Sequence, residues 1–238
     1  STLMKTIAGL QPADSGEIIF NGQHVLENPV FIKKQLGYLP QEFGVYPKLS
    51  ACQLMDHLAV LKGIHKSERK EHILALLQKV NLYEQRNKEV HLFSGGMKQR
   101  FGIAQALLGN PQLIIVDEPT AGLDPEERNR FNNLLSEISE QIIVILSTHI
   151  VEDVRSLCSQ MAIIDKGKLV ASGEPEKFIH RLTGSIWSKT IHKQDLQEYA
   201  AKFPIISSQL NAGQLRIHVH AAALPGHGFE PVKPTLED

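Results

Sequence analysis

The sequence predicts an α/β protein whose core is a largely parallel sheet, with a small α+β region at its carboxyl end. Short apolar runs such as LIIVDEP and IIVILSTH alternate with helical patterns, as is typical of strands joined by crossover helices. The stretch between these two runs, PEERNRFNNLLSEIS, spaces its apolar residues as an amphipathic helix does. After Gly184 the alternation weakens, so we place a first domain at residues 1–183 and an accessory region at 184–238.

The amino-terminal part of the chain predicts one helix and two strands. Residues 2–10 carry apolar side chains at helical spacing and run into Gly and Pro turn signals, so we expect a helix there. EIIFNG, residues 17–22, predicts a strand that ends in a turn. LGYLPQ, residues 36–41, predicts a second strand.

The pattern becomes helical between residues 50 and 80. SACQLMDHLAVLKG and SERKEHILALLQKV each begin with a serine, Ser50 or Ser67, which is suited to accept a hydrogen bond from a first-turn amide. We therefore expect two capped helices inserted between sheet elements, within a helical subdomain at about residues 50–108.

Strands resume at residues 113–119 and 142–149. The helix between them, residues 125–139, begins with Pro125, which suits a first helical turn. MAIIDKGKLVASG has the turn chemistry of a hairpin around Lys166-Gly167. The accessory region then predicts a strand, a helix and two strands in SIWSKTIH, DLQEYAAKF, PIISSQL and QLRIHVHA.

Composition is that of an ordinary globular protein and excludes several classes of function. The 238 residues carry a formal net charge of -1, which gives no electrostatic reason to expect a nucleic-acid partner. Cys52 and Cys158 lack metal-ligand spacing, so free thiols are favoured over a disulfide or a zinc site. His218 and His220 would share a strand face, and a solvated face is favoured there over a metal site. No apolar run approaches the ~20 residues that cross a bilayer.

Candidate catalytic residues concentrate in LIIVDEPTAGLDP. Adjacent carboxylates, Asp117 and Glu118, at the end of a buried strand are unfavourable unless they hold a cation, and open α/β sheets bind their ligands at this edge. Asp117 is suited to hold a hydrated magnesium ion, and Glu118 to polarise a water molecule that attacks a phosphate. From these two residues alone, a capped loop before a helix is an equally good interpretation.

A second candidate lies in HLFSGGMKQRFGIAQALLG. Ser94 is suited to cap a helix, and Gly95 and Gly96 would expose backbone N–H groups at its positive end, where anions bind. For this stretch alone, a plain capped helix after a Gly-Gly turn is the favoured interpretation. Gln41 and His149 each follow a predicted strand and are individually uninformative.

Gln41, SGGMKQR, LIIVDEPTAGLDP and STH, taken together and in this order, resemble the nucleotide-binding subunit of ATP-binding-cassette (ABC) transporters over nearly the whole chain. The resemblance implies a P-loop NTPase cassette with a helical subdomain, and ATP and Mg²⁺ as ligands. By this resemblance, Asp117 is the metal ligand and Glu118 is the catalytic base. Gln41 would contact the metal and the attacking water. Asp124 would be the D-loop aspartate, and His149 would contact the γ-phosphate. Phe93 and Met97 are mild departures from the family pattern.

The resemblance also implies a second copy of the subunit, because Ser94, Gly95 and Gly96 would lie over the nucleotide that the second copy binds. Ser1 and Thr2 match the residues after the lysine of the phosphate loop, where Ser1 would bind magnesium and Thr2 a phosphate oxygen. The glycines and lysine of that loop, and the adenine-stacking aromatic residue, are missing. We therefore expect a sequence that is incomplete at the phosphate loop, which is favoured over the alternative of a natural pseudoenzyme. We expect no ATP turnover by these residues alone.

Within this family the chain is most similar to ATPase subunits of bacterial exporters that pair with a separate transmembrane permease, at the cytoplasmic face of the plasma membrane. An importer subunit and a non-transport or non-hydrolysing module are the alternatives. EFGVYPKLS and the helix SACQLMDHLAVL would form the permease groove, with Val45, Tyr46 and Leu49 as apolar contacts. For Leu49, inward packing is an equally good interpretation.

Overall fold

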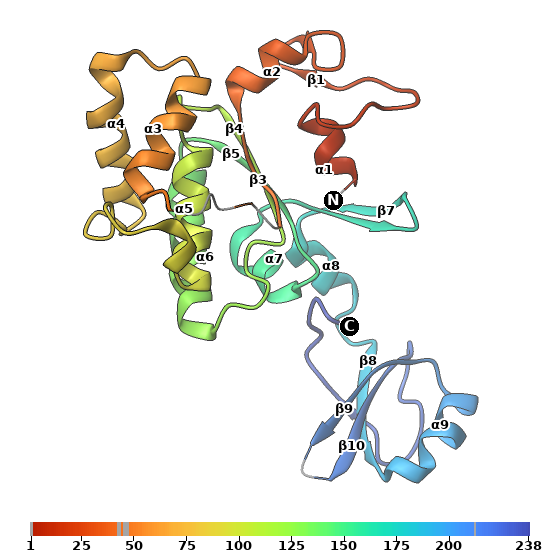
Figure 1. Ribbon diagram of the computed structural model, residues 1–238. Coiled ribbons are helices and arrows are strands. Elements are labelled where there is room, and N and C mark those ends of the chain that lie inside the picture. The colour runs from red at the N-terminus through yellow and green to blue at the C-terminus, as the bar shows by residue number, and fades with distance from the viewer. Residues whose placement is uncertain (1, 42–43, 45–47, 212) are drawn as a thin grey trace. The chain divides into compact units, whose positions relative to one another are not determined.

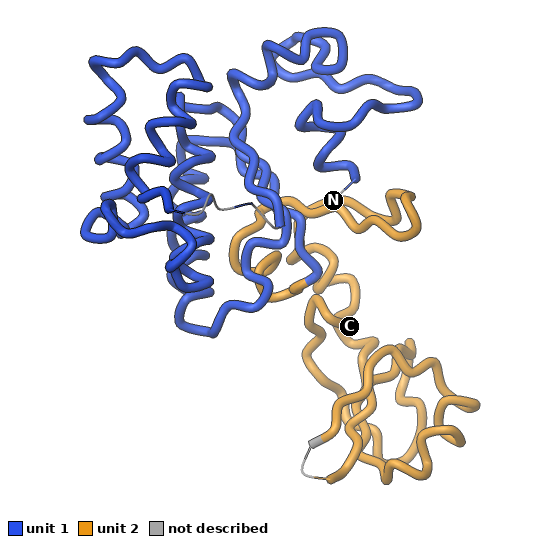
Figure 2. Tube along the Cα trace, in the orientation of Figure 1, with its two compact units in different colours: residues 1–149 blue, residues 150–238 orange. Residues whose placement is uncertain are grey.

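The structure, a computed structural model of the chain (Figure 1), describes residues 2–41, 44, 48–211 and 213–238. Contacts divide the chain into two compact units, residues 1–149 (unit 1) and 150–238 (unit 2), which Figure 2 colours separately. The domain boundary expected at residues 183/184 rests on the change of sequence pattern and stays a prediction.

Unit 1 contains the predicted parallel sheet. Its strands are β3 (Leu36–Leu39), β4 (Leu113–Asp117) and β5 (Ile143–Ser147), in the order β3-β4-β5. Every residue of the central strand β4 is buried, as the unbroken apolar run predicts for a strand covered on both faces. The three predicted strands are confirmed, each shorter than the run that predicted it.

Helices α5 (Gly95–Ala106) and α6 (Pro125–Ser139) belong to the same unit, and α6 has the predicted bounds. The end of α5 lies close to β3. A Cβ added at Gly37 would lie 2.8 Å from the carbonyl carbon of Ala106, so only glycine permits this approach of strand and helix.

The amino-terminal elements are α1 (Thr2–Ile7), β1 (Ile19–Phe20), β2 (Gln23–His24) and α2 (Pro29–Gln35). The predicted helix at 2–10 and strand at 17–22 are both present but shorter. Helix α2 was not predicted, because seven residues are too few to show a clear helical period, and it is the Asn28 side chain, accepting from the Phe31 amide, that starts it. Ile32 of α2 packs with Leu36 and Leu113 in a buried apolar cluster.

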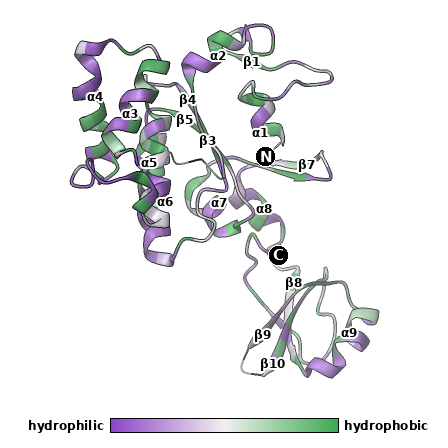
Figure 3. Ribbon diagram, in the orientation of Figure 1, coloured by the Kyte–Doolittle hydropathy of each residue, from purple (hydrophilic) through white to green (hydrophobic). Residues whose placement is uncertain are grey.

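The helical insertion contains α3 (Ala51–Leu61), α4 (Lys66–Lys79) and the 3₁₀ turn η1 (Val90–Leu92). In Figure 3, α3, α4 and α6 each carry both hydrophilic and hydrophobic colours, as amphipathic helices should. Ser50 caps α3 as predicted and forms a full capping box with Gln53, with bonds of 3.3 and 2.9 Å.

The predicted cap at Ser67 is wrong. Helix α4 begins at Lys66, and its cap is His65, whose Nδ1 accepts from the Ser67 amide at 3.5 Å and lies 2.7 Å from Ser67 Oγ. The serine is already inside the first turn, so its hydroxyl supports the capping imidazole instead of replacing it.

Replacing Ser50 by alanine should therefore lower the free energy of unfolding by about 1 kcal/mol, because the Gln53 amide in the first turn of α3 loses the hydroxyl that accepts from it. Ser67→Ala is the matched control and should cost clearly less, since the hydroxyl of Ser67 does not cap α4. Chemical denaturation, monitored by circular dichroism, measures the free energy of unfolding of both variants. Equal losses in the two variants would contradict the caps described here.

Unit 2 begins with α7 (Val151–Leu157), the strands β6 (Met161–Asp165) and β7 (Lys168–Gly173), and α8 (Pro175–Arg181). The predicted hairpin is confirmed: β6 and β7 pair antiparallel, and Lys166 and Gly167 have φ of 47° and 77°, as a tight two-residue hairpin turn requires.

The rest of unit 2 consists of β8 (Ile186–Ile191), the 3₁₀ turn η2 (Lys193–Asp195), α9 (Leu196–Lys202), β9 (Ile205–Asn211), β10 (Gln214–His220) and β11 (Glu230–Pro231). The predicted strand, helix and two strands are confirmed, and β11 is added. The antiparallel sheet has the order β11-β8-β10-β9. Its core includes Ile217, Val219 and Phe229, with Tyr199 and Phe203 of the α9 segment packed against it.

The prediction that His218 and His220 lie on a solvated strand face is only partly confirmed. His218 is only partly exposed, and its Nδ1 lies 2.7 Å from Asp238 Oδ1, which sequence spacing does not reveal. Burial opposes ionisation of Asp238, but hydrogen bonds from His218 and Thr235 outweigh it and hold the pKa of that carboxyl below its ordinary value. His220 is exposed, as predicted.

Cys52 and Cys158 are free thiols. Over the described part of the chain, no helix has both the length and the apolar character that crossing a bilayer demands.

Candidate functional site

Four predicted site residues come together at the carboxyl edge of the sheet in unit 1. Parallel pairing aligns Leu39 with Val116 and Asp117 with Ser147, so β3, β4 and β5 end at the same edge. The residues at or just after these ends are Gln41, which is exposed, then Asp117 and Glu118, and then His149. Sheets of this kind bind ligands at this edge.

Glu118 and His149 are in direct contact. His149 Nδ1 lies 2.7 Å from Glu118 Oε2, and the carboxylate is mostly buried, at 17% exposure, whereas the imidazole is 74% exposed. Glu118 has a left-handed backbone with φ of 50°, which is unfavourable for a residue with a side chain, and its amide donates to the Ser147 carbonyl at 2.8 Å. The structure thus holds the Glu118 carboxylate beside the His149 imidazole.

Asp117 ends the buried strand β4 and is itself only 2% exposed. Burial raises the pKa of the Tyr38 hydroxyl on β3, and the charge of the Asp117 carboxylate raises it further. A buried carboxylate fits Mg²⁺, which takes oxygen ligands and commonly uses only one or two carboxylates. In the described residues no three His, Cys, Asp or Glu are grouped to hold a metal.

The second predicted group lies at the start of α5. Ser94 caps this helix as predicted, with Oγ accepting from the Met97 amide at 3.3 Å. Ser94 and Gly95 are exposed while Gly96 is buried. The exposed turn therefore carries the partial positive charge of a twelve-residue helix.

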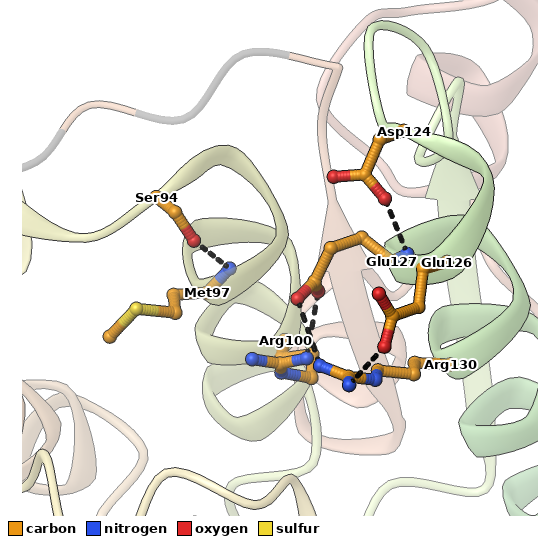
Figure 4. A network of polar contacts seen from close by, with 7 residues as sticks. All are labelled: Ser94, Met97, Arg100, Asp124, Glu126, Glu127 and Arg130. Carbon is orange, nitrogen blue, oxygen red and sulfur yellow. Dashed lines mark hydrogen bonds and ion pairs between the residues drawn. The ribbon is translucent and has the colours of Figure 1, made fainter.

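The start of α6 lies against the start of α5 (Figure 4). Asp124 caps α6 by accepting from the Glu127 amide at 2.9 Å. The Glu127 carboxylate in turn accepts from Arg100 of α5 at 2.8 Å. Sequence reasoning missed Arg100 and Glu127 because the two residues are 27 positions apart, and no local pattern predicts their pairing.

The structure does not place the other predicted site residues at this edge or at the start of α5. Ser1, Val45 and Tyr46 lie outside the described residues. Thr2 is the exposed first residue of α1, and its carbonyl accepts from the Thr6 hydroxyl at 3.2 Å. Leu49 is half-buried, which leaves its role as a partner contact a prediction.

Comparison with known proteins gives a consistent result. Residues 1–121 match the family described as "ABC transporter". The linearmycin resistance ATP-binding protein LnrL of Bacillus subtilis is 36% identical over 185 residues, which cover 77% of this chain and 60% of the relative. The probable multidrug ABC transporter ATP-binding protein YbhF of Escherichia coli is 28% identical over 253 residues, which cover 100% of this chain and 44% of the relative.

The chain thus spans less than two thirds of the length of each of these relatives. A solved structure described as "Structure of ATP binding subunit of ABC transporter" is similar in fold, with a TM-score of 0.65 and 29% sequence identity. The similarity covers 76% of this chain and 75% of that one.

Proposed function

This chain belongs to the ABC transporter family, as an ATP-binding domain, and from that membership we propose that it hydrolyses ATP to drive export of a substrate through a separate permease. The observation that carries the proposal is the Glu118–His149 contact at the carboxyl edge of the sheet, next to the buried carboxylate of Asp117. Fold and family alone would be compatible with a module that binds ATP without hydrolysing it.

Each residue at this edge has a role in the proposed reaction. Glu118 accepts a proton from the water that attacks the γ-phosphate, and His149, which bonds the same carboxylate, keeps it oriented. Asp117, together with Gln41 and Ser1, would hold Mg²⁺, and the ion would offset the negative charge of the phosphates. Thr2 contacts a phosphate oxygen.

The active form is proposed to be a dimer. In the family arrangement, the turn Ser94-Gly95-Gly96 of one copy, in which Ser94 and Gly95 are exposed, and Asp124 close over the nucleotide held by the other copy. The geometry at the start of α5 supports this, because an exposed, capped helix start attracts a phosphate. A homodimer is the simplest form of this assembly.

The remaining partner is proposed to be a transmembrane permease at the cytoplasmic face of the plasma membrane. The helix α3 and the stretch before it would carry the docking groove, in which Val45, Tyr46 and Leu49 are the proposed apolar contacts. Export is favoured over import because one relative is named for linearmycin resistance and another as a multidrug transporter protein. Transport assays with the permease in membrane vesicles distinguish export from import. ATP-dependent accumulation of substrate in inside-out vesicles indicates export. Accumulation of substrate only in right-side-out vesicles indicates import.

Hydrolysis itself should require a glycine-rich phosphate loop with its lysine. We expect residues 1–238 alone to bind ATP weakly and to release no phosphate, because they contain no glycine-rich loop with its lysine to hold the β- and γ-phosphates. A loop-complete version, extended ahead of Ser1 by such a phosphate loop, should turn ATP over in the presence of Mg²⁺. Phosphate release at the same rate by both polypeptides would show that the loop is dispensable and would contradict the proposed mechanism.

A further inference from the structure

The Glu127 carboxylate lies against the first turn of α5. Gly96 is the second residue of that helix and is buried, and a Cβ added there would lie 2.6 Å from Glu127 Cδ and 2.9 Å from Cγ. Glycine at position 96 therefore makes room for the side chain of Glu127. A negative charge consequently sits beside the helix start that, in the proposed function, receives the phosphates of a second copy.

Arg100, one turn further along α5, compensates this charge. Its Nη1 donates to Glu127 Oε2 at 2.8 Å, and the two side chains are only 12% and 20% exposed. The other carboxylate oxygen, Oε1, accepts from Arg130 of α6 at 3.3 Å, but Arg130 is 56% exposed. The shielded pair is therefore the stronger one, because water screens it less.

The same glutamate reaches the loop before α6. Its backbone amide donates to Asp124 Oδ1 at 2.9 Å, and Figure 4 shows the continuous set of contacts from Arg100 through Glu127 to Asp124. The starts of α5 and α6 are thus tied by one residue. A displacement of Glu127 would move the exposed turn of α5 relative to Asp124.

We propose that Arg100 and Glu127 are positioning residues for ATP-driven dimer closure. Glu127 holds the start of α5 against the start of α6, and Arg100 cancels the carboxylate charge that would otherwise repel the triphosphate of the opposite copy. This inference rests on the proposed function, since it requires nucleotide to bind between two copies.

The test uses the loop-complete version carrying Glu118→Gln, in which ATP should stay bound. Arg100→Gln should raise the ATP concentration that gives half-maximal dimer about 10- to 100-fold, because it leaves a shielded carboxylate uncompensated near the phosphates. Adding Glu127→Gln to Arg100→Gln should recover most of this loss, since no uncompensated charge remains. Arg100→Lys should retain most of the parent's response. Size-exclusion chromatography across an ATP titration measures all of them.

Arg130→Gln is the matched control, because it removes the exposed arginine from the same carboxylate, and it should shift the ATP requirement by less than about threefold. With Glu118 intact, Glu127→Gln separates positioning from charge. It should lower kcat several-fold without raising KM for ATP, whereas Arg100→Gln should raise KM. The Glu127→Gln result does not depend on whether Arg100→Gln folds well. Because a smaller folded fraction would also lower the apparent kcat, the rate is divided by the concentration of ATP-binding sites measured in the same sample.

The inference is overturned if Arg100→Gln reaches half-maximal dimer at the same ATP concentration as the parent. It is also overturned if the double variant needs as much ATP for half-maximal dimer as Arg100→Gln alone. An unchanged kcat in Glu127→Gln would also overturn the positioning role. If the Glu118→Gln parent forms no ATP-dependent dimer while Arg100 and Glu127 are intact, the proposed function fails, and the inference fails with it.

Discussion

Replacing Glu118 by glutamine in the loop-complete version should lower the rate of ATP hydrolysis about 100- to 10,000-fold, the usual effect of removing a general base. The amide keeps the shape of the side chain and an oxygen that bonds His149, so nucleotide should remain bound. Phosphate release measures the rate, and size-exclusion chromatography with ATP should show a persistent dimer.

The change should leave the fold intact, because the left-handed backbone at residue 118 is the same for either side chain. Glu137→Gln, at an exposed position of α6, is the control and should leave the rate unchanged. Normal turnover by Glu118→Gln would mean that Glu118 is not the base, and His149 would become the better candidate.

Phe101→Ala should lower the free energy of unfolding of unit 1 by about 3–5 kcal/mol, as truncation of a fully buried aromatic residue does. Phe101 lies on α5 with 0% exposure, and its ring meets the edge of Phe93 at a centroid distance of 6.0 Å. The start of α5 should then be less rigidly packed, so ATP-driven dimerisation should also be reduced.

The probe for this experiment must report on unit 1. The single tryptophan of the chain, Trp187, lies in unit 2, so its fluorescence would not follow the loss, whereas hydrogen exchange of the α5 amides would. Leu92→Ala, next to the same aromatic pair but 56% exposed, is the matched control and should cost less than about 1 kcal/mol. A loss in Leu92→Ala as large as that in Phe101→Ala would contradict this packing.

Local sequence pattern was sufficient for the elements that carry the site. The apolar run before Asp117 predicts a strand buried on both faces, and β4 is buried throughout. Pro125 and the helical spacing after it predict α6 with its observed bounds, because a helix start depends on residues within one turn of each other. The edge that gathers Gln41, Asp117 and His149 follows from the same patterns, since parallel strands must end together.

Packing decided what joins these elements. The caps show the limit at short range: Ser50 caps α3 as predicted, but α4 begins one residue before Ser67, and the imidazole of His65 takes the cap. At longer range, no spacing rule places Glu127 beside Arg100 and Gly96.

Residues 1–238 therefore encode, through apolar period and turn chemistry, a parallel sheet with Asp117, Glu118 and His149 at its carboxyl edge and a capped helix start at Ser94. The direct Glu118–His149 contact, the Arg100–Glu127 pair and the His218–Asp238 pair were decided only by the tertiary structure. Their partners lie 31, 27 and 20 positions apart, so each distance depends on how whole strands and helices pack, which propensities acting over one helical turn do not determine.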